Sequence, residues 1–100
     1  MKNLSILGST GSIGTNALEV VRRFPETFNV AALCAKTSVE ALAAQIVEFE
    51  PELAAVFDAN GADRLKALLP AGCATEIVCG PSGYRQTADY FGGKIGRAHV

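Results

Sequence analysis

The apolar positions of the chain alternate between two spacings, one typical of strands and one typical of helices. Short, largely apolar runs predict strands at 4–7, 30–35, 53–57 and 75–79, and the uninterrupted run at 30–35 is characteristic of a strand covered on both faces. Between these runs, apolar residues recur every three or four positions, which predicts helices at 12–24, 39–50, 62–69 and 84–91. Strand and helix therefore alternate along the chain, joined by short links.

This alternation predicts an α/β fold, a Rossmann-like doubly wound parallel sheet with helices on its faces. A doubly wound sheet normally has more than four strands, so we expect this one to be truncated. Residues 1–91 should form one partial N-terminal domain. Ile95 to Val100 match one translation frame of a common sequencing adapter, so residues 92–100 are expected to be a non-native tail, with a natural C-terminus as the alternative.

The helical spacing also predicts which faces of the first two helices point inward. The residues expected to be buried are Ile13, Ala17, Val20, Val21 and Phe24 in the first helix, and Val39, Leu42, Ala43, Ile46 and Val47 in the second. Thr37 and Glu40 have the spacing of a capping box at the start of the second helix. Arg22 is expected to stabilise a helix dipole, and Glu48 to be solvated.

The most informative motif is a loop with glycines three residues apart, between the first strand and the first helix. Gly8 allows a sharp turn, Gly11 allows the backbone to approach a pyrophosphate, and Gly14 allows the helix to pack closely on the strand. The amides of residues 10–13 are expected to face the phosphates, and Ser9, Thr10 and Ser12 add hydroxyl donors. The alternative is a turn with only a structural role. The flanking strand and helix favour a dinucleotide site at Gly8, Ser9, Thr10, Gly11, Ser12 and Ile13.

The end of the second strand bears on which dinucleotide binds. NAD-specific folds place a carboxylate there to hold the ribose 2′-hydroxyl, whereas this chain has Lys36, Thr37 and Ser38. One cation and two hydroxyls suit a 2′-phosphate, so the sequence favours NADP over NAD. The alternative is a solvated lysine followed by a threonine that only caps a helix.

Composition limits the other possible functions. Nine basic and ten acidic residues give a net charge of −1, which argues against nucleic acid as a partner. No apolar run is long enough to span a membrane, and three cysteines without metal-ligand spacing indicate reduced thiols in the cytoplasm. The single histidine, His99, has no catalytic partner near it in the sequence, so the segment alone is expected to have no catalytic residue and no metal site.

The residues of these motifs resemble those of a known protein family. The stretches 2–14, 18–22 and 30–35 are similar to the N-terminus of 1-deoxy-D-xylulose 5-phosphate reductoisomerase. The resemblance implies an NADPH-dependent enzyme that rearranges and reduces 1-deoxy-D-xylulose 5-phosphate to 2-C-methyl-D-erythritol 4-phosphate in non-mevalonate isoprenoid biosynthesis. It also implies a Mg or Mn ion bound by a part of the enzyme outside this segment, a sugar-phosphate substrate and a homodimer. The family has a second cofactor-binding segment, commonly Gly-Lys-Asn, which aligns with Lys36, Thr37 and Ser38. None of these three residues is identical to the family's residue at its position.

Two other classes of protein fit the same residues. Extended short-chain dehydrogenases and sugar-nucleotide epimerases share the glycine spacing, and a downstream Tyr-x-x-x-Lys motif would favour them. A non-catalytic NADP-sensing regulator would also lack catalytic residues.

Overall fold

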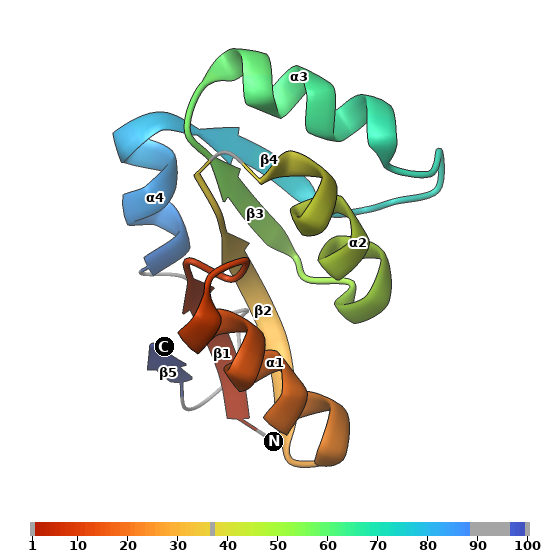
Figure 1. The fold of residues 1–100 in the computed structure, drawn as a ribbon, viewed down its shortest axis with the longest axis vertical. Helices are drawn as coiled ribbons and strands as arrows, with labels where there is room; N and C mark the ends of the chain where they lie inside the picture. The colour runs from red at the N-terminus through yellow and green to blue at the C-terminus, as the bar shows by residue number, and fades with distance from the viewer. Residues whose placement is uncertain (1, 37, 89–96, 100) are drawn as a thin grey trace.

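A computed structural model describes residues 2–36, 38–88 and 97–99 of the chain. The nine elements run β1 (Lys2–Leu7), α1 (Ser12–Arg23), β2 (Phe28–Cys34), α2 (Val39–Phe49), β3 (Leu53–Val56), α3 (Ala59–Leu68), β4 (Glu76–Cys79), α4 (Gly80–Ala88) and β5 (Arg97–His99). All strands pair in parallel, in the order β4-β3-β2-β1-β5 (Figure 1).

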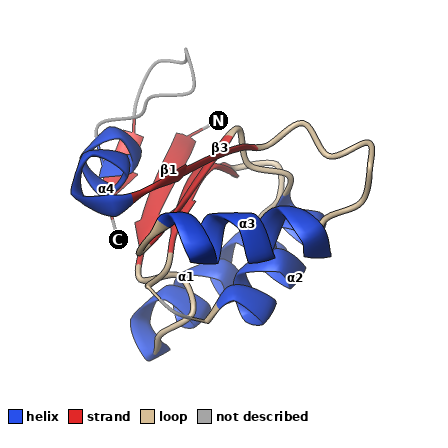
Figure 2. Ribbon diagram, turned by 90° about the horizontal axis from the view of Figure 1, so that it is seen from above, coloured by secondary structure: helices blue, strands red, loops and turns tan. Residues whose placement is uncertain are grey.

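The sheet is covered on both faces. Helices α1, α2 and α3 lie together on one face, and α4 lies on the other (Figure 2). The chain moves outward from β1 to β4 and then returns to place β5 on the free side of β1. Because parallel crossovers keep one handedness, this change of direction moves the connecting helix to the opposite face. The prediction of a doubly wound α/β sheet is confirmed.

The strands are buried because both faces are covered. Residues 30–35 of the second strand region are all 8 % exposed or less, and Leu53 to Val56 are all 1 % or less. These strands read as continuous apolar runs for that reason. From the helices, Leu18, Leu42, Ile46 and Leu65 complete the core.

Several element bounds differ from those expected from the sequence. β1 begins at Lys2 and β2 at Phe28, because their first residues already pair in register, Lys2 opposite Phe28. α3 begins at Ala59 rather than Ala62, because the Asp58 side chain accepts a hydrogen bond from Gly61 N–H at 2.8 Å and caps the helix. α4 begins at Gly80 rather than Tyr84, so residues 80–83 form the first turn of the helix.

The predicted inward face of α1 is wrong in part. Ile13, Val20 and Phe24 are 74 %, 45 % and 54 % exposed, and the buried residues are Gly14, Leu18 and Val21. Gly14 brings the start of the helix so close to the loop that this side, rather than the side of Ile13, faces the sheet. In α2 the expected stripe is buried except for Val47, which is 54 % exposed.

Candidate functional site

The glycine loop follows β1 at the carboxyl edge of the sheet and is held by its own backbone. Gly8 has a φ of +70°, a left-handed conformation that favours glycine. Gly11 N–H donates to Gly8 O at 3.0 Å, and Ser9 N–H donates to Cys34 O of β2 at 2.9 Å. The Gly11 amide is therefore engaged inside the loop, so the prediction that all amides of residues 10–13 face a ligand is wrong for Gly11.

The start of α1 leaves backbone donors at the surface. The first intrahelical bond runs from Thr15 N–H to Gly11 O at 2.9 Å, so the amides of residues 12–14 precede it. Gly11 is the N-cap and has no side chain to satisfy them. These amides, together with the positive end of the helix dipole, favour an anion. Ser12 and Ile13 are both exposed there, and Thr10 is half-buried.

Gly14 determines how closely α1 approaches the loop. A Cβ at this position would lie 2.3 Å from Gly8 O and 2.6 Å from Ser9 Cα. Both are backbone atoms, which cannot rotate away. The close approach predicted for the third glycine of the motif is present, and it is made against the loop that follows the strand.

Ser9 differs from the other predicted site residues because its side chain lies inside the protein. It is fully buried, and its hydroxyl has no hydrogen-bond partner among the described residues. The sequence predicted that the Ser9 hydroxyl donates to a phosphate on the surface of the loop. Because this hydroxyl is buried, it cannot do so. Its carbonyl oxygen accepts from Gln45 Nε2 of α2 at 2.9 Å.

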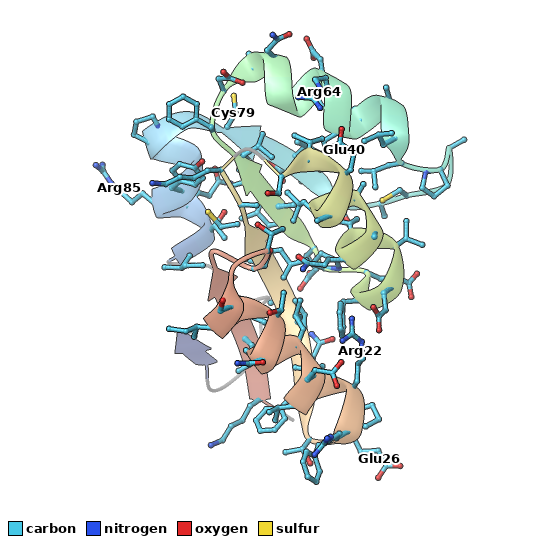
Figure 3. The ribbon with its side chains drawn as sticks, viewed as in Figure 1. Arg22, Glu26, Glu40, Arg64, Cys79 and Arg85 are labelled. Atoms are coloured by element: carbon cyan, nitrogen blue, oxygen red, sulfur yellow. The ribbon has the colours of Figure 1, made fainter. Side chains whose placement is uncertain are left out.

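A hollow of about 400 Å³ lies beside the loop, at the ends of β1 and β2. It is lined by Leu7, Gly8, Cys34, Ala35, Lys36, Tyr84 and Arg85. Tyr84 closes one side and donates its hydroxyl to Ala35 O at 3.3 Å. Lys36 and Arg85 are exposed at its border, and Arg85 projects outward from α4 (Figure 3). The hollow therefore combines apolar walls with two cations.

Burial controls the titration of the two polar side chains in these walls. It raises the pKa of the Cys34 thiol to about 11, against a smaller lowering by the Gly8 backbone. It also raises the pKa of Tyr84, with smaller contributions from Cys34 and Asp58. At neutral pH both groups are uncharged, and a protonated thiol is a poor nucleophile. Cys34 therefore packs in the wall of the hollow and is not an activated nucleophile.

The structure brings most of the predicted site residues to one edge. Residues 8–11 form the loop, Ser12 and Ile13 open α1, and Lys36 and Ser38 follow β2 at the same edge. Ser38 is the exposed N-cap of α2 but makes no side-chain capping bond, while Glu40 pairs with Arg64 at 2.8 Å (Figure 3). Thr37, and with it the predicted capping box, lies outside the described residues.

Sequence reasoning missed three residues of this region, namely Gln45, Tyr84 and Arg85. Gln45 interrupts an apolar helical stripe, and such a polar residue signals a buried hydrogen bond. Tyr84 and Arg85 come to the loop only because α4 crosses to the other face of the sheet, which no local pattern reveals.

Other features of the described residues lie apart from this edge. A hollow of about 600 Å³ lies between the end of α2 and the start of β4, at the amino ends of the strands. The parts of the chain that the structure describes contain no cluster of three or more His, Cys, Asp or Glu side chains suited to a metal ion. None of the described helices has both the length and the apolar character needed to cross a bilayer.

Three features define a dinucleotide-binding Rossmann-type fold. The site lies at the carboxyl ends of parallel strands, a glycine loop opens a helix there, and the strand order reverses beside β1. A model of the 1-deoxy-D-xylulose 5-phosphate reductoisomerase family matches residues 4–94. The chain belongs to this family, and not to the extended short-chain dehydrogenases that share its glycine spacing. The predicted non-native tail at 92–100 stays a prediction, since the match ends within it.

Curated relatives carry the same family name. The reductoisomerase of Desulfosudis oleivorans is 56 % identical over 84 residues, which are 84 % of this chain and 22 % of the relative. That of Chlorobaculum tepidum is 51 % identical over 88 residues, 88 % of this chain and 23 % of the relative. The chain thus spans less than a quarter of the length of these relatives.

Solved structures with the same fold include complexes with cofactor. The reductoisomerase of Zymomonas mobilis in complex with NADPH superposes with a TM-score of 0.80 at 30 % identity, over 87 % of this chain and 23 % of that one. A reductoisomerase in complex with NADPH, fosmidomycin and magnesium gives 0.81 at 31 % identity, over 88 % and 22 %.

Proposed function

We propose that this chain is the NADPH-binding segment of a 1-deoxy-D-xylulose 5-phosphate reductoisomerase. The observation that carries the proposal is the glycine loop, whose surface amides open α1 at the point where the strand order reverses. Membership of the family, and the NADPH in two solved relatives, support the same cofactor here.

The cofactor would lie across the ends of β1 and β2. The amides of Thr10, Ser12 and Ile13 would donate to the pyrophosphate, and the hydroxyls of Thr10 and Ser12 would add to them. Gly8 and Gly11 leave room for the phosphate because neither carries a side chain. Ser9 would hold the loop from inside rather than touch the ligand, since it is fully buried.

The hollow beside the loop would receive the adenosine end. Its apolar walls suit a base, and Lys36 and Arg85 at its border suit a 2′-phosphate dianion. Ser38 would supplement them through its hydroxyl or amide at the start of α2, and Thr37 is proposed with it from the sequence. A second cation from α4 strengthens the preference for NADPH over NADH that the sequence favoured.

The chemistry of the whole enzyme is proposed from the family alone. A full-length protein containing this segment would isomerise and reduce 1-deoxy-D-xylulose 5-phosphate to 2-C-methyl-D-erythritol 4-phosphate, with NADPH supplying the hydride. The described residues offer no carboxylate cluster for a Mg or Mn ion, so we assign that ion to the rest of the enzyme. We further propose that the enzyme acts in the cytoplasm as a homodimer.

The substitution Lys36→Glu tests the cofactor assignment. It places a carboxylate opposite the 2′-phosphate and offers the NADH ribose hydroxyl an acceptor, so NADPH affinity should fall at least tenfold while NADH affinity changes less. Calorimetric titration of the chain with both cofactors measures this difference. The same titration in a chimera, with residues 1–88 replacing the matching segment of the Desulfosudis oleivorans enzyme, provides a second protein for the comparison.

Lys66→Glu is the matched control, because Lys66 is exposed on α3 and the change in net charge is the same. It should leave both affinities within twofold. Equal losses for NADPH and NADH with Lys36→Glu would show that Lys36 is a solvated loop residue. If the unchanged chain and the chimera bind neither cofactor, the proposed function is wrong.

A further inference from the structure

Gln45 is a buried amide that reaches from α2 into the glycine loop. Its residue is 9 % exposed, and its Nε2 donates to Ser9 O at 2.9 Å across 36 positions of sequence. Its neighbours in α2, Leu42 and Ile46, belong to the apolar core. Burying an amide costs about 1–3 kcal/mol unless its hydrogen bonds are replaced, and Gln45 Oε1 has no partner among the described residues. An apolar side chain at this position would therefore serve the core better than glutamine does.

The bond to Ser9 O fixes the orientation of one peptide group. Cis peptide bonds are absent from the described residues, so the Ser9–Thr10 peptide is trans and planar. In such a group the carbonyl of one residue and the N–H of the next point in opposite directions. Because Ser9 O points at α2, Thr10 N–H points away from α2, toward the outer side of the loop.

Thr10 N–H is available in that orientation. Among the described residues, none accepts a hydrogen bond from it, whereas the Ser9 and Gly11 amides on either side are engaged with Cys34 O and Gly8 O. Without the donor from Gln45, Ser9 O would be a buried acceptor without a partner, at a cost of about 1–3 kcal/mol. A flip of the peptide would relieve that cost, but it would turn a carbonyl oxygen toward the place where a phosphate binds.

We propose that Gln45 is a positioning residue for cofactor binding, which holds Thr10 N–H toward the pyrophosphate by fixing the Ser9–Thr10 peptide. The inference rests on the proposed function, because it assigns a role within the same phosphate site. Gln45 itself does not touch the ligand.

The test compares two ligands that differ in the pyrophosphate. Gln45→Met keeps the length of the side chain but removes the donor, so NADPH affinity should fall about tenfold, the effect of losing one hydrogen bond to a charged group. Adenosine 2′-phosphate, which has no pyrophosphate, should lose less than twofold. Titration of the chain and of the chimera with both ligands measures the difference. Gln86→Met is the matched control, because Gln86 is exposed on α4, and it should change neither affinity.

A second variant separates positioning from packing. Gln45→Glu supplies a donor to Ser9 O only when its carboxyl group is protonated, and otherwise faces the carbonyl with a negative charge. Its NADPH affinity, measured relative to the unchanged chain, should therefore rise as the pH falls from 8 to 6. A packing role predicts no such recovery.

Two results would overturn the inference while leaving the proposed function intact. One is an equal loss of NADPH and adenosine 2′-phosphate affinity with Gln45→Met, and the other is a pH-independent affinity of Gln45→Glu relative to the unchanged chain. Failure of the unchanged proteins to bind NADPH would instead refute the proposed function, and with it the role of Gln45.

Discussion

At the scale of single residues, the glycines of the loop differ in what their missing side chain permits. Gly11 borders open space, since an added Cβ would meet only Gly8 O at 3.4 Å, an ordinary contact. Gly14 is enclosed by backbone atoms at 2.3 and 2.6 Å. The second is therefore required by the fold, whereas we propose that the first is required by the bound cofactor.

Gly14→Ala should destabilise the chain although alanine is the better helix former. The gain in helix propensity is about 1 kcal/mol, whereas forcing a methyl group against backbone costs about 1–3 kcal/mol and moves the loop. We expect a net loss of up to about 2 kcal/mol in the free energy of unfolding, measured by urea denaturation. Gly11→Val should leave that free energy within about 0.5 kcal/mol but lower NADPH affinity at least tenfold. A stable Gly14→Ala chain with unchanged NADPH affinity would contradict this division of roles.

Much of the site could be predicted at this scale, because the glycine spacing reports local backbone geometry. Gly8 and Gly14 were assigned their roles from position alone. The burial of Ser9 could not be predicted, because its hydroxyl is equally suited to a phosphate and to the interior. The contact of its carbonyl with Gln45 could not be predicted either, because Gln45 is distant in sequence and meets the loop only after α2 has packed.

At the scale of elements, the C-terminal ends of α1 and α2 are joined through one arginine. Arg22 donates to Glu48 Oε1 at 2.7 Å, also contacts Glu19, and lies over the ring of Phe49 at 5.2 Å (Figure 3). The hydrogen bonds from Arg22 hold the pKa of Glu48 below its ordinary value of 4.5. Arg22 thus joins two helices. The sequence predicted that Glu48 is free in solvent, whereas in the structure it is paired with Arg22.

Glu48→Gln should lower stability in a pH-dependent way. Because the folded-state pKa of Glu48 is depressed, the pair stabilises the chain above pH 4.5, and this contribution disappears as the pH falls through the folded-state pKa. Both side chains are more than 40 % exposed, so the expected loss at pH 7 is only about 0.5 kcal/mol. Urea denaturation at pH 7, 5 and 3 measures it. Glu26→Gln, an exposed carboxylate near the same end of α1, is the control, and a pH-independent difference for Glu48→Gln would refute the assignment.

Element types were predicted well because strands buried on both faces and amphipathic helices leave different periods in the sequence. The orientation of α1 was predicted wrongly in part, because hydrophobic spacing assigns Ile13, Val20 and Phe24 to the core. The same spacing does not identify Gly14 as a buried position, since glycine has no side chain. Gly14, where two backbones approach closely, lies on the side of α1 that also buries Leu18 and Val21.

At the scale of the whole molecule, β1 is an interior strand rather than an edge strand because β5 pairs on its outer side. Asn3, Leu4 and Ser5 lie opposite Arg97, Ala98 and His99. The sequence indicated a parallel sheet but could not give the strand order, which depends on contacts between segments far apart in the chain. The β5 pairing in particular lies in a stretch with no strand periodicity.

Removal of residues 97–100 should therefore turn β1 into an edge strand. Two or three backbone hydrogen bonds would be lost, and after the ordering entropy is subtracted we expect about 1 kcal/mol less stability. The exposed edge should also promote self-association. Urea denaturation measures the first effect, and sedimentation velocity at several protein concentrations measures the second. A truncated chain that stays monomeric with unchanged stability would show that β5 contributes nothing to the sheet.

The contact between Tyr84 and Ala35 has an optical consequence. The chain contains no tryptophan and only two tyrosines, of which Tyr84 lines the hollow and Tyr90 lies outside the described residues. Its phenol donates to a backbone carbonyl, so its emission depends on whether that contact stays intact and on what stacks against the ring. An adenine entering the hollow should therefore quench the ultraviolet fluorescence of the protein, and Tyr84→Phe should abolish most of the change. Cofactor binding to the site can therefore be followed by the intrinsic tyrosine fluorescence of the protein, without any added label.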